Sequence, residues 1–570
     1  MNLIPEVKKL EKKGGFLLKN YIKPFLADID NRILKAADKI PTGDDGASLT
    51  VNYGKDISSE AYELEITEDK IIIDAEGVRG AFYAIQTLRQ ILRNKNIPCV
   101  KISDEPDFSY RGIYHDVSRG KVPTVKTLKD FIDKLAYFKI NSLQLYIEHT
   151  FEFEETKELT KITGALTKEE ILELDSYAYE NFVEFVPSVA TFGHMFEILE
   201  MEKFRDLRVL KDYDKKPNFW LDRMRHHTID PLNEKSINLI KSLIDQYAPL
   251  FSSDKFNICG DETFDLKRYD SGVDAGKMYL DFTKKIVSVV RSHEKKVMMW
   301  GDVMLNHPEI IPEIPDEVIC LSWDYHEEPD EEKIIRFKEL GKTQIVCPGT
   351  GTWSRFTERV SKAEKNISKM IDYGKKHGAV GMLNTNWGDY GNPCSIEMAM
   401  YGIVLSAAKS WNVLENPGEE FYKKIDDVLY GGEGAFSYLR KVSDVHEEVA
   451  NEWNALCCKY FELRFGEKAA RTFPITEENT LMAQEEMRKV ISELSSSKWE
   501  YDEAREELIL SAEAVIMLAE YSCKLNGLNY KKTFDLEKWL NKYKEKWLNK
   551  NKESELGKIS EMLLYIEEKK

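Results

Sequence analysis

The spacing of apolar residues changes twice along this chain of 570 residues. Up to residue 104 the pattern is mixed: the runs YELEIT and DKIIIDA alternate as strands do, while GAFYAIQTLRQIL has apolar residues at helical spacing. From residue 415 onward, segments such as YDEAREELILSAEAVIMLAEYSCKL follow only the helical period. The pattern therefore predicts a small α/β domain over residues 1–104 and an α-helical domain over residues 415–570.

Between these two regions, over residues 105–414, short apolar runs alternate with longer helical segments. Eight runs are candidate strands: RGIYHDV, NSLQLYI, VEFVPSV, KFNICG, KVMMWG, EVICLSW, TQIVCPG and AVGMLNTNW. Strands that alternate with helices pair in parallel, and eight such units in roughly 250 residues are typical of a closed (β/α)8 barrel. An open doubly wound sheet is the alternative, but no glycine-rich phosphate loop follows the first strand.

Chemically useful side chains gather at the predicted strand ends, where barrels of this kind place their active residues. Four tryptophans end a strand or follow one, namely Trp300, Trp323, Trp353 and Trp387. The same ends also carry Arg111, His115, Asp116, Glu148, His149, His194, Asp302, Asp324, Tyr325 and Asp389. A single tryptophan is more often part of a core, but four at one rim beside carboxylates favour a sugar pocket, in which rings stack and hydroxyls find polar partners.

An adjacent pair of carboxylates, Asp261 and Glu262, follows the fourth predicted strand in the run NICGDETF. Two neighbouring acids on a surface turn are usually just solvated. Here they follow an apolar strand whose glycine lets the backbone kink at the barrel mouth. Burying two carboxylates side by side costs free energy unless each has a partner or a task. We therefore interpret Asp261 and Glu262 as the candidate catalytic pair.

The formal net charge of -18 limits the classes of partner. It repels nucleic acid and anionic membranes, so neither is an expected partner. No stretch is apolar over the ~18 residues that a membrane span needs, and the first residues do not have the pattern of a secretory signal. The eight cysteines have no metal-ligand spacing, which predicts free thiols and neither a metal site nor a cofactor. We therefore expect a cytoplasmic protein.

Several of these runs together resemble glycoside hydrolase family 20, the β-N-acetylhexosaminidases. The runs are RGIYHDVSR, FIDKLAYFKINSLQL, FVPSVATFGH, TIDPLNEKSINLIKSLI, NICGDE and, ahead of the barrel, IIIDAEGVRGAFYAIQTLRQIL. The strongest is NICGDE, because the family marks its catalytic pair with an Asp-Glu doublet after glycine. The resemblance covers roughly residues 60–411. The helical C-terminal region resembles that of a divergent bacterial subgroup.

The resemblance implies a retaining exo-β-N-acetylhexosaminidase in which the substrate's own acetamido oxygen attacks the anomeric carbon. It implies that Glu262 is the general acid and then base, and that Asp261 accepts the acetamido N–H and stabilises an oxazolinium intermediate. Arg111 resembles the family arginine that holds the sugar's 3- and 4-hydroxyls. The indoles of Trp300, Trp323 and Trp387 resemble the walls around the sugar, and Asp389 falls where the family often has a glutamate for the 4- and 6-hydroxyls.

The sequence departs from the family pattern at three places. The second strand ends in YIEHTFEF, so Glu148 or His149 takes the place of a Thr/Ser-Asp-Asp run. The loop after the seventh strand, PGTGTWSRF, has Trp353 and no tyrosine, and Tyr325 is our substitute donor to the acetamido oxygen. The shorter Asp389 predicts acceptance of both glucosaminides and galactosaminides. His194 is interpreted either as a pocket residue or as a satisfied core histidine.

Two other functions remain open from the sequence. A degenerate barrel of this kind would bind carbohydrate without turnover, although the intact Asp261–Glu262 pair speaks against it. A two-carboxylate glycosidase would need a second acid about 5 Å from Glu262, for which Asp302 and Asp324 are the candidates. The expected partner is a glycan with a terminal β-N-acetylhexosamine. The apolar helical surface beyond residue 415 also predicts a homodimer formed through that domain.

Overall fold

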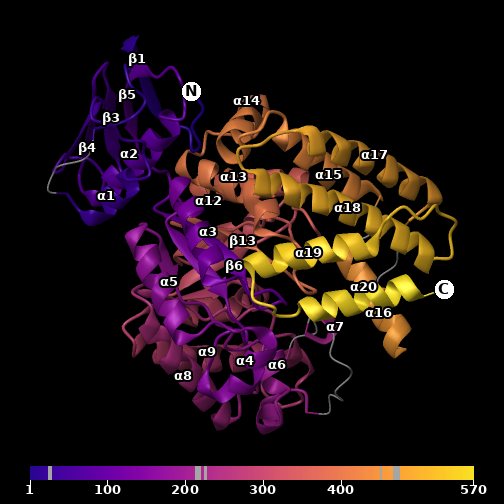
Figure 1. Cartoon of the computed structure of the whole chain (residues 1–570). Coiled ribbons are helices and arrows are strands. Elements are labelled where there is room, and N and C mark those ends of the chain that lie inside the picture. Colours follow the sequence, from indigo (N-terminus) through magenta and orange to yellow (C-terminus); the bar gives the residue numbers. More distant parts are fainter. Residues whose placement is uncertain (24–28, 212–219, 224–226, 450–451, 467–474, 570) are drawn as a thin grey trace.

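The computed structural model describes residues 1–23, 29–211, 220–223, 227–449, 452–466 and 475–569. Figure 1 shows three successive parts of the chain, from the indigo N-terminal sheet through the barrel to the yellow C-terminal helices. Within the described ranges, no helix is both long enough and apolar enough to cross a membrane. All eight cysteines lie in these ranges, and all are buried.

The N-terminal sheet forms from strands that alternate buried and partly exposed side chains. In β3 (Tyr62–Ile66) every second side chain is buried, and the strand packs against α2 (Val78–Ile91). The strand order is β1-β5-β3-β4-β2, in which only β2 and β4 are parallel neighbours. The other elements are β1 (Lys9–Phe16), α1 (Asn31–Ala37), β2 (Ser48–Asn52), β4 (Lys70–Ala75) and β5 (Pro98–Asp104).

Helix α2 is buried on both faces because the barrel covers the side that the sheet leaves free. Tyr83 of α2 packs edge-on against Trp411 of the last barrel helix, with ring centroids 5.2 Å apart. On the sheet side, Gly80 lies so close to Ala61 that an added Cβ would come within 2.2 Å of its carbonyl oxygen. The N-terminal domain is thereby fixed to the barrel wall.

Eight parallel strands form the central barrel (Figure 1). Their pairing order is β8-β7-β6-β13-β12-β11-β10-β9, and a parallel bridge between Ser188 and Asn257 joins the two ends of the sheet. The strands are almost entirely buried, because side chains fill the inside and helices cover the outside. They are β6 (Tyr110–Asp116), β7 (Ser142–Tyr146), β8 (Glu184–Val186), β9 (Lys255–Asn257), β10 (Lys296–Trp300), β11 (Ile319–Trp323), β12 (Gln344–Cys347) and β13 (Gly381–Asn386).

Helices with one apolar face surround the strands. The longer ones are α3 (Val125–Tyr137), α5 (Lys168–Glu180), α8 (Glu234–Tyr247), α9 (Ala275–Arg291), α11 (Glu331–Glu339), α12 (Val360–His377) and α13 (Met400–Trp411). Shorter ones lie in the connecting loops, namely α4 (Lys157–Thr163), α6 (Phe196–Leu199), α7 (Trp220–Arg223) and α10 (Asp302–Asn306). The predicted (β/α)8 barrel is confirmed, and each of the eight predicted runs overlaps one of its strands.

The described part of the chain after residue 415 is helical, as predicted. The helices are α14 (Glu419–Lys424), α15 (Ala435–Val449), α16 (Trp453–Phe465), α17 (Glu477–Ser496), α18 (Asp502–Leu525), α19 (Leu536–Lys550) and α20 (Leu556–Glu568). Helix α18 is buried along most of its length, because α15, α16, α17 and α19 all pack against it. Its apolar residues therefore form the core of this region rather than an outer face.

Candidate active site

A cavity of about 270 Å³ opens at the C-terminal ends of the barrel strands. This volume is close to the lower limit, about 300 Å³, of pockets that hold small ligands. The lining residues are Arg119, His194, Asp261, Glu262, Trp300, Trp323, Tyr325, Trp353, Trp387 and Asp389. All of them except Arg119 are among the residues that the sequence nominated, and they come from seven of the eight strand ends.

The Asp261–Glu262 doublet reaches the cavity because the backbone bends sharply after β9. Cys259, Gly260 and Glu262 have positive φ angles of 56°, 82° and 48°. This conformation is strained for the two residues that have a Cβ, and such strain is typical of functional sites. The bend is held by Tyr279, whose hydroxyl donates a hydrogen bond of 2.8 Å to the carbonyl oxygen of Gly260.

The imidazole of His194 lies between the two carboxylates. Its Nε2 is 3.1 Å from Asp261 Oδ2 and 3.4 Å from Glu262 Oε2. Burial acts to lower the pKa of His194, but the charge and hydrogen bonding of Asp261 and Glu262 outweigh it and raise the pKa to about 10. The imidazole is therefore a cation at neutral pH. Gly193 permits this approach, because a Cβ there would lie 2.3 Å from the carbonyl oxygen of Asp261.

A third carboxylate, Asp302, holds the backbone of Glu262. Its Oδ2 accepts the Glu262 N–H at 3.0 Å, and its Oδ1 accepts the Trp323 indole N–H at 3.5 Å. Burial and the neighbouring charge of Asp261 raise the pKa of Asp302. Asp302 does not line the cavity, so its contacts orient the doublet rather than offer a second group to a ligand.

Aromatic rings form the walls of the cavity. Trp323 and Tyr325 stack with ring centroids 5.0 Å apart, and Trp353 lies 5.3 Å from Tyr325. The Trp387 indole N–H donates a hydrogen bond of 2.8 Å to the Tyr325 hydroxyl. Trp300 closes the cavity from the barrel interior, where it is almost completely buried. These rings offer flat apolar faces to a bound ligand beside the carboxylates.

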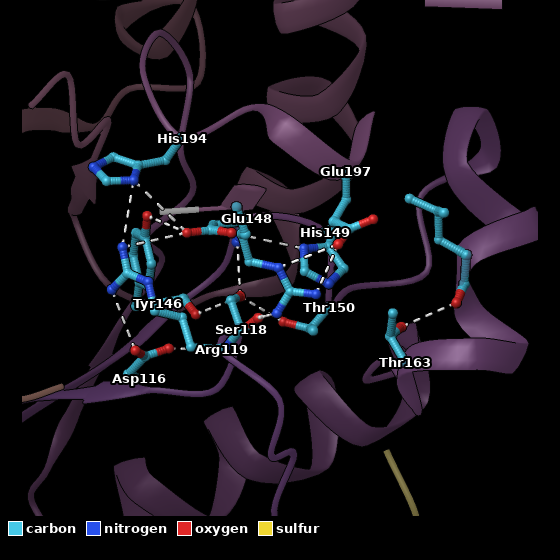
Figure 2. A network of polar contacts seen from close by, with 12 residues as sticks. Asp116, Ser118, Arg119, Tyr146, Glu148, His149, Thr150, Thr163, His194 and Glu197 are labelled. Atoms are coloured by element: carbon cyan, nitrogen blue, oxygen red, sulfur yellow. Dashed lines mark hydrogen bonds and ion pairs between the residues drawn. The ribbon is translucent and has the colours of Figure 1, made fainter. Parts of the chain in front are cut away.

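Arg119 provides the guanidinium of the cavity, and the sequence analysis missed it. Figure 2 shows the guanidinium between Asp116 on one side and Glu148 and His194 on the other. Its Nη1 lies 3.3 Å from Asp116 Oδ2 and 3.6 Å from Asp389 Oδ1, and its Nη2 lies 3.4 Å from Glu148 Oε1. A planar cation fixed by three carboxylates keeps one orientation, which suits it to hydrogen bonding with ligand hydroxyls.

Arg111, which the sequence placed in the pocket, lies elsewhere. It is the second residue of β6 and therefore lies near the N-terminal end of that strand, at the opposite end of the barrel. Its buried guanidinium pairs with Glu60 of the N-terminal domain at 2.7 Å and donates to the carbonyl oxygen of Phe108. The run RGIYHDVSR contains both arginines, and only Arg119 follows the strand's C-terminal end. Arg111 thus joins two domains.

Glu148 and His149 also require a correction, since neither lines the cavity. Glu148 lies behind it, where its Oε1 accepts a hydrogen bond of 2.8 Å from the Tyr146 hydroxyl. His149 is also buried, and its burial lowers its pKa to about 4, so it is neutral at pH 7. Asp324, another predicted strand-end residue, does not line the cavity either, and its carboxylate pairs with Lys333 at 2.8 Å. Glu148 therefore acts on the cavity through Arg119 rather than directly.

Two other residues at the end of β6 lie outside the cavity lining. His115 Nδ1 accepts a hydrogen bond of 3.0 Å from the amide Nδ2 of Asn386, and burial lowers the pKa of His115 to about 4. Asp116 accepts the Gly388 N–H at 3.0 Å in addition to its pairing with Arg119. The end of β6 is thereby tied to the loop after β13.

One group of possible metal ligands occurs among the described residues, and it consists of His194, Asp261 and Glu262. Each offers an atom within 4.8 Å of the other two. The three side chains place one imidazole between two carboxylates, an arrangement suited to proton transfer and to stabilising positive charge in a bound ligand.

Comparison with protein families matches most of the chain up to residue 395. The model of the glycosyl hydrolase family 20 catalytic domain matches residues 108–395, and that of family 20 domain 2 matches residues 19–105. A β-hexosaminidase of Porphyromonas gingivalis is 25% identical over 375 residues, which are 58% of this chain and 46% of that protein. One from Emericella nidulans is 24% identical over 326 residues, 50% of this chain and 52% of that protein. The chain thus spans about half the length of these relatives.

Solved structures share the fold. A β-N-acetylhexosaminidase from Bacteroides fragilis aligns with a TM-score of 0.60 at 20% identity, over 75% of this chain and 95% of that one. A Flavobacterium johnsoniae chitobiase aligns with a TM-score of 0.62 at 18% identity, over 95% of this chain and 96% of that one. The second alignment extends into the helical region that follows the barrel.

Proposed function

Because the chain belongs to glycosyl hydrolase family 20, we propose that it is a retaining exo-β-N-acetylhexosaminidase. It releases terminal β-linked N-acetylglucosamine, N-acetylgalactosamine or both from a glycan or glycoconjugate. The observation that carries this proposal is the Asp261–Glu262 doublet, bridged by the imidazole of His194 inside a tryptophan-walled cavity. The cavity volume of about 270 Å³ supports binding of a single sugar ring, as exo action requires.

The reaction starts when the acetamido oxygen of the substrate attacks its own anomeric carbon, as in the substrate-assisted exceptions to the two-carboxylate scheme. Glu262 gives its proton to the leaving oxygen. Its side chain is 30% exposed, against 12% for Asp261, which supports a place at the mouth where the aglycone departs. Water then attacks the oxazolinium intermediate while Glu262 takes back a proton. Two inversions leave the product in the β configuration.

Asp261 stabilises the oxazolinium and accepts its N–H. Its Oδ2 faces His194, whereas its Oδ1 is buried without a hydrogen-bond partner among the described residues. A buried carboxylate oxygen that lacks a partner costs free energy, and an N–H donor from a bound acetamido group would offset that cost. The enclosing indoles strengthen this charge interaction because they exclude water.

Arg119 takes the role that the sequence analysis gave to Arg111, holding the sugar's hydroxyls together with Asp389. We expect Arg119→Lys to lower kcat/KM about 100-fold, because lysine keeps the charge but loses the planar fork of donors. Arg111→Lys is the matched control, since it disturbs an ion pair of comparable burial at the other end of the barrel. It should lower the melting temperature and leave kcat/KM within about threefold. Equal losses of kcat/KM in both variants would contradict this assignment.

The experiment that tests the proposed function compares the rates on p-nitrophenyl β-glycosides with and without the 2-acetamido group. Turnover of only the acetamido sugars, with the β-anomer appearing first in proton NMR, is the expected result. A protein that binds N-acetylglucosamine without hydrolysing any of these substrates would be a carbohydrate-binding barrel instead. Comparable rates on glucosaminide and galactosaminide would support the relaxed preference that we expect from Asp389.

The two-carboxylate alternative is less well supported. It has two candidate nucleophiles, and neither lines the cavity. Asp324 pairs with Lys333, and one carboxylate oxygen of Asp302 accepts the Glu262 N–H. A glycosyl-enzyme trapped on Asp302 by a fluorinated substrate would nevertheless establish it.

We also propose the division into domains 1–104, 105–414 and 415–570, and a cytoplasmic location without nucleic-acid or membrane partners. The eight buried cysteines, which show no paired spacing in the sequence, support a reducing compartment. We expect alkylation of freshly isolated protein to label none of them while it is folded and all eight after denaturation without a reductant. Fewer than eight labels after denaturation would reveal disulfides and argue for an oxidising compartment.

A homodimer through the helical domain remains our proposal for assembly. Exposed apolar side chains on its helices support it, namely Leu481, Met482, Leu548 and Leu564. Light scattering at micromolar concentration is expected to give twice the chain mass of 66.1 kDa. A single species at the chain mass would contradict the dimer.

A further inference from the structure

The turn between α19 and α20 lies across the loop that carries Arg119. Lys552 N donates to Val122 O at 2.8 Å, Thr124 N donates to Lys550 O at 2.9 Å, and an antiparallel bridge joins Pro123 to Asn551. A backbone bond of 3.1 Å from Glu555 N to Gly120 O extends this pairing to the residue next to Arg119. The loop after β6 is therefore backed by a strand-like segment from a domain more than 400 residues further along the chain.

The side chain of Glu555 reaches beneath this loop. It is 5% exposed, its Oε1 pairs with Arg223 Nη2 at 2.7 Å, and its Oε2 accepts the Trp220 indole N–H at 2.6 Å. Although burial opposes ionisation, Arg223 and Lys558 hold the pKa of Glu555 well below its usual range. Removing the Glu555 carboxylate would take from the buried Arg223 guanidinium one of the two carboxylates that pair with it, the other being Glu197.

Arg223 carries the contact onward to the cavity wall. Its Nη1 donates to the carbonyl oxygen of Ser118 at 3.2 Å, and its Nη2 pairs with Glu197 at 2.7 Å. Figure 2 shows Ser118 bonded to its neighbours beside Glu148 and Thr150. The Ser118 hydroxyl accepts the Glu148 N–H at 2.8 Å and contacts Thr150 Oγ1 at 2.8 Å. Ser118 is therefore in contact with Arg223 and precedes Arg119 in the sequence. It also contacts Glu148, which forms an ion pair with Arg119.

We propose that Glu555 of the helical domain is a positioning residue of the active site, which fixes the Arg119 guanidinium through Arg223 and Ser118. This inference rests on the proposed function in so far as Arg119 binds the substrate. It gives the C-terminal domain a role in the reaction, because Glu555, which lies outside the barrel, joins Glu197 of the barrel in pairing with Arg223 on this side of the pocket. A shift of about 1 Å in a group that binds substrate can cost on the order of 100-fold in rate.

The test is the variant Glu555→Gln, which keeps the shape of the side chain and removes its charge. We expect kcat/KM for the p-nitrophenyl N-acetylglucosaminide to fall at least about tenfold. The matched control is Glu561→Gln on the same helix, whose carboxylate is exposed and accepts only a 3.2 Å bond from Tyr460 among the described residues. It should retain wild-type kinetics. All variants are assayed at a temperature where circular dichroism shows them folded.

A double-mutant cycle with Arg119→Lys separates positioning from a general loss of structure. If Glu555 acts through Arg119, Glu555→Gln should change kcat/KM less than about twofold in the Arg119→Lys background. Losses that multiply across the cycle would overturn the proposal, as would wild-type kinetics in Glu555→Gln.

A second readout does not depend on activity. It therefore distinguishes a failure of the positioning role of Glu555 from a failure of the proposed function. Hydrogen exchange followed by mass spectrometry should show faster exchange over residues 117–124 in Glu555→Gln and no change there in Glu561→Gln. Wild-type exchange in that loop would overturn the positioning role even if the wild type hydrolyses no hexosaminide.

Discussion

Glu262→Gln is expected to lower kcat/KM by about 10²–10⁴-fold on substrates whose leaving group is an alcohol of a second sugar, because it removes the general acid. The loss should be much smaller for aryl leaving groups that depart without protonation. Steady-state kinetics across a series of aryl and alkyl β-N-acetylglucosaminides measures this as a steeper dependence of rate on leaving-group pKa in the variant. Glutamine preserves the shape of the side chain and its contact with the loop.

The control for this variant is Asp270→Asn, which removes an exposed carboxylate a few residues further along the same loop. It should leave both the rate and the leaving-group dependence unchanged. An equal loss on every substrate in Glu262→Gln would assign Glu262 a binding role and contradict the general-acid role.

Asp261→Asn is expected to lower kcat/KM on the order of 10²–10³-fold for good and poor leaving groups alike. Asparagine removes the charge that supports the oxazolinium, whose formation precedes departure of any aglycone. It can also present a donor where the acetamido N–H needs an acceptor. The measurement uses the same substrate series. A plot of log kcat/KM against leaving-group pKa should have the same slope for Asp261→Asn as for the wild type, not a steeper one.

A stable thiazoline analogue of the oxazolinium gives a second test of Asp261. It should bind the wild type far more tightly than N-acetylglucosamine, as transition-state-like ligands do. Calorimetry should show that Asp261→Asn loses most of that preference and that Glu262→Gln keeps more of it. Tight thiazoline binding by Asp261→Asn would remove the role that we give to Asp261.

The relation between the two carboxylates depends on His194. Nε2 of its imidazole is within 3.4 Å of both, and the pKa of the imidazole is raised to about 10 as a result. Ligand binding that places a positive charge next to Asp261 would weaken the ion pairing between Asp261 and the imidazole.

The sequence by itself determined the architecture and the position of the Asp261–Glu262 doublet at the barrel mouth. Apolar periodicity is a local property, so the eight strand runs and the helical segments could be recognised from neighbouring residues alone. The position of Asp261 and Glu262 after a buried strand is also local, since parallel strands place their following loops at one mouth of a barrel. The same holds for the tryptophans at the ends of β10 and β11.

Only the tertiary structure decided which polar side chains meet. Arg111 and Arg119 are eight positions apart in one run. Most of strand β6 lies between them, so Arg111 is at the N-terminal end of the barrel and Arg119 is in the pocket at the C-terminal end. The contact of Glu555 with Arg223 joins residues 332 positions apart. Such pairings follow from how domains pack around a loop, and the free energy that selects them comes from burying opposite charges together. No local pattern of residues encodes that choice.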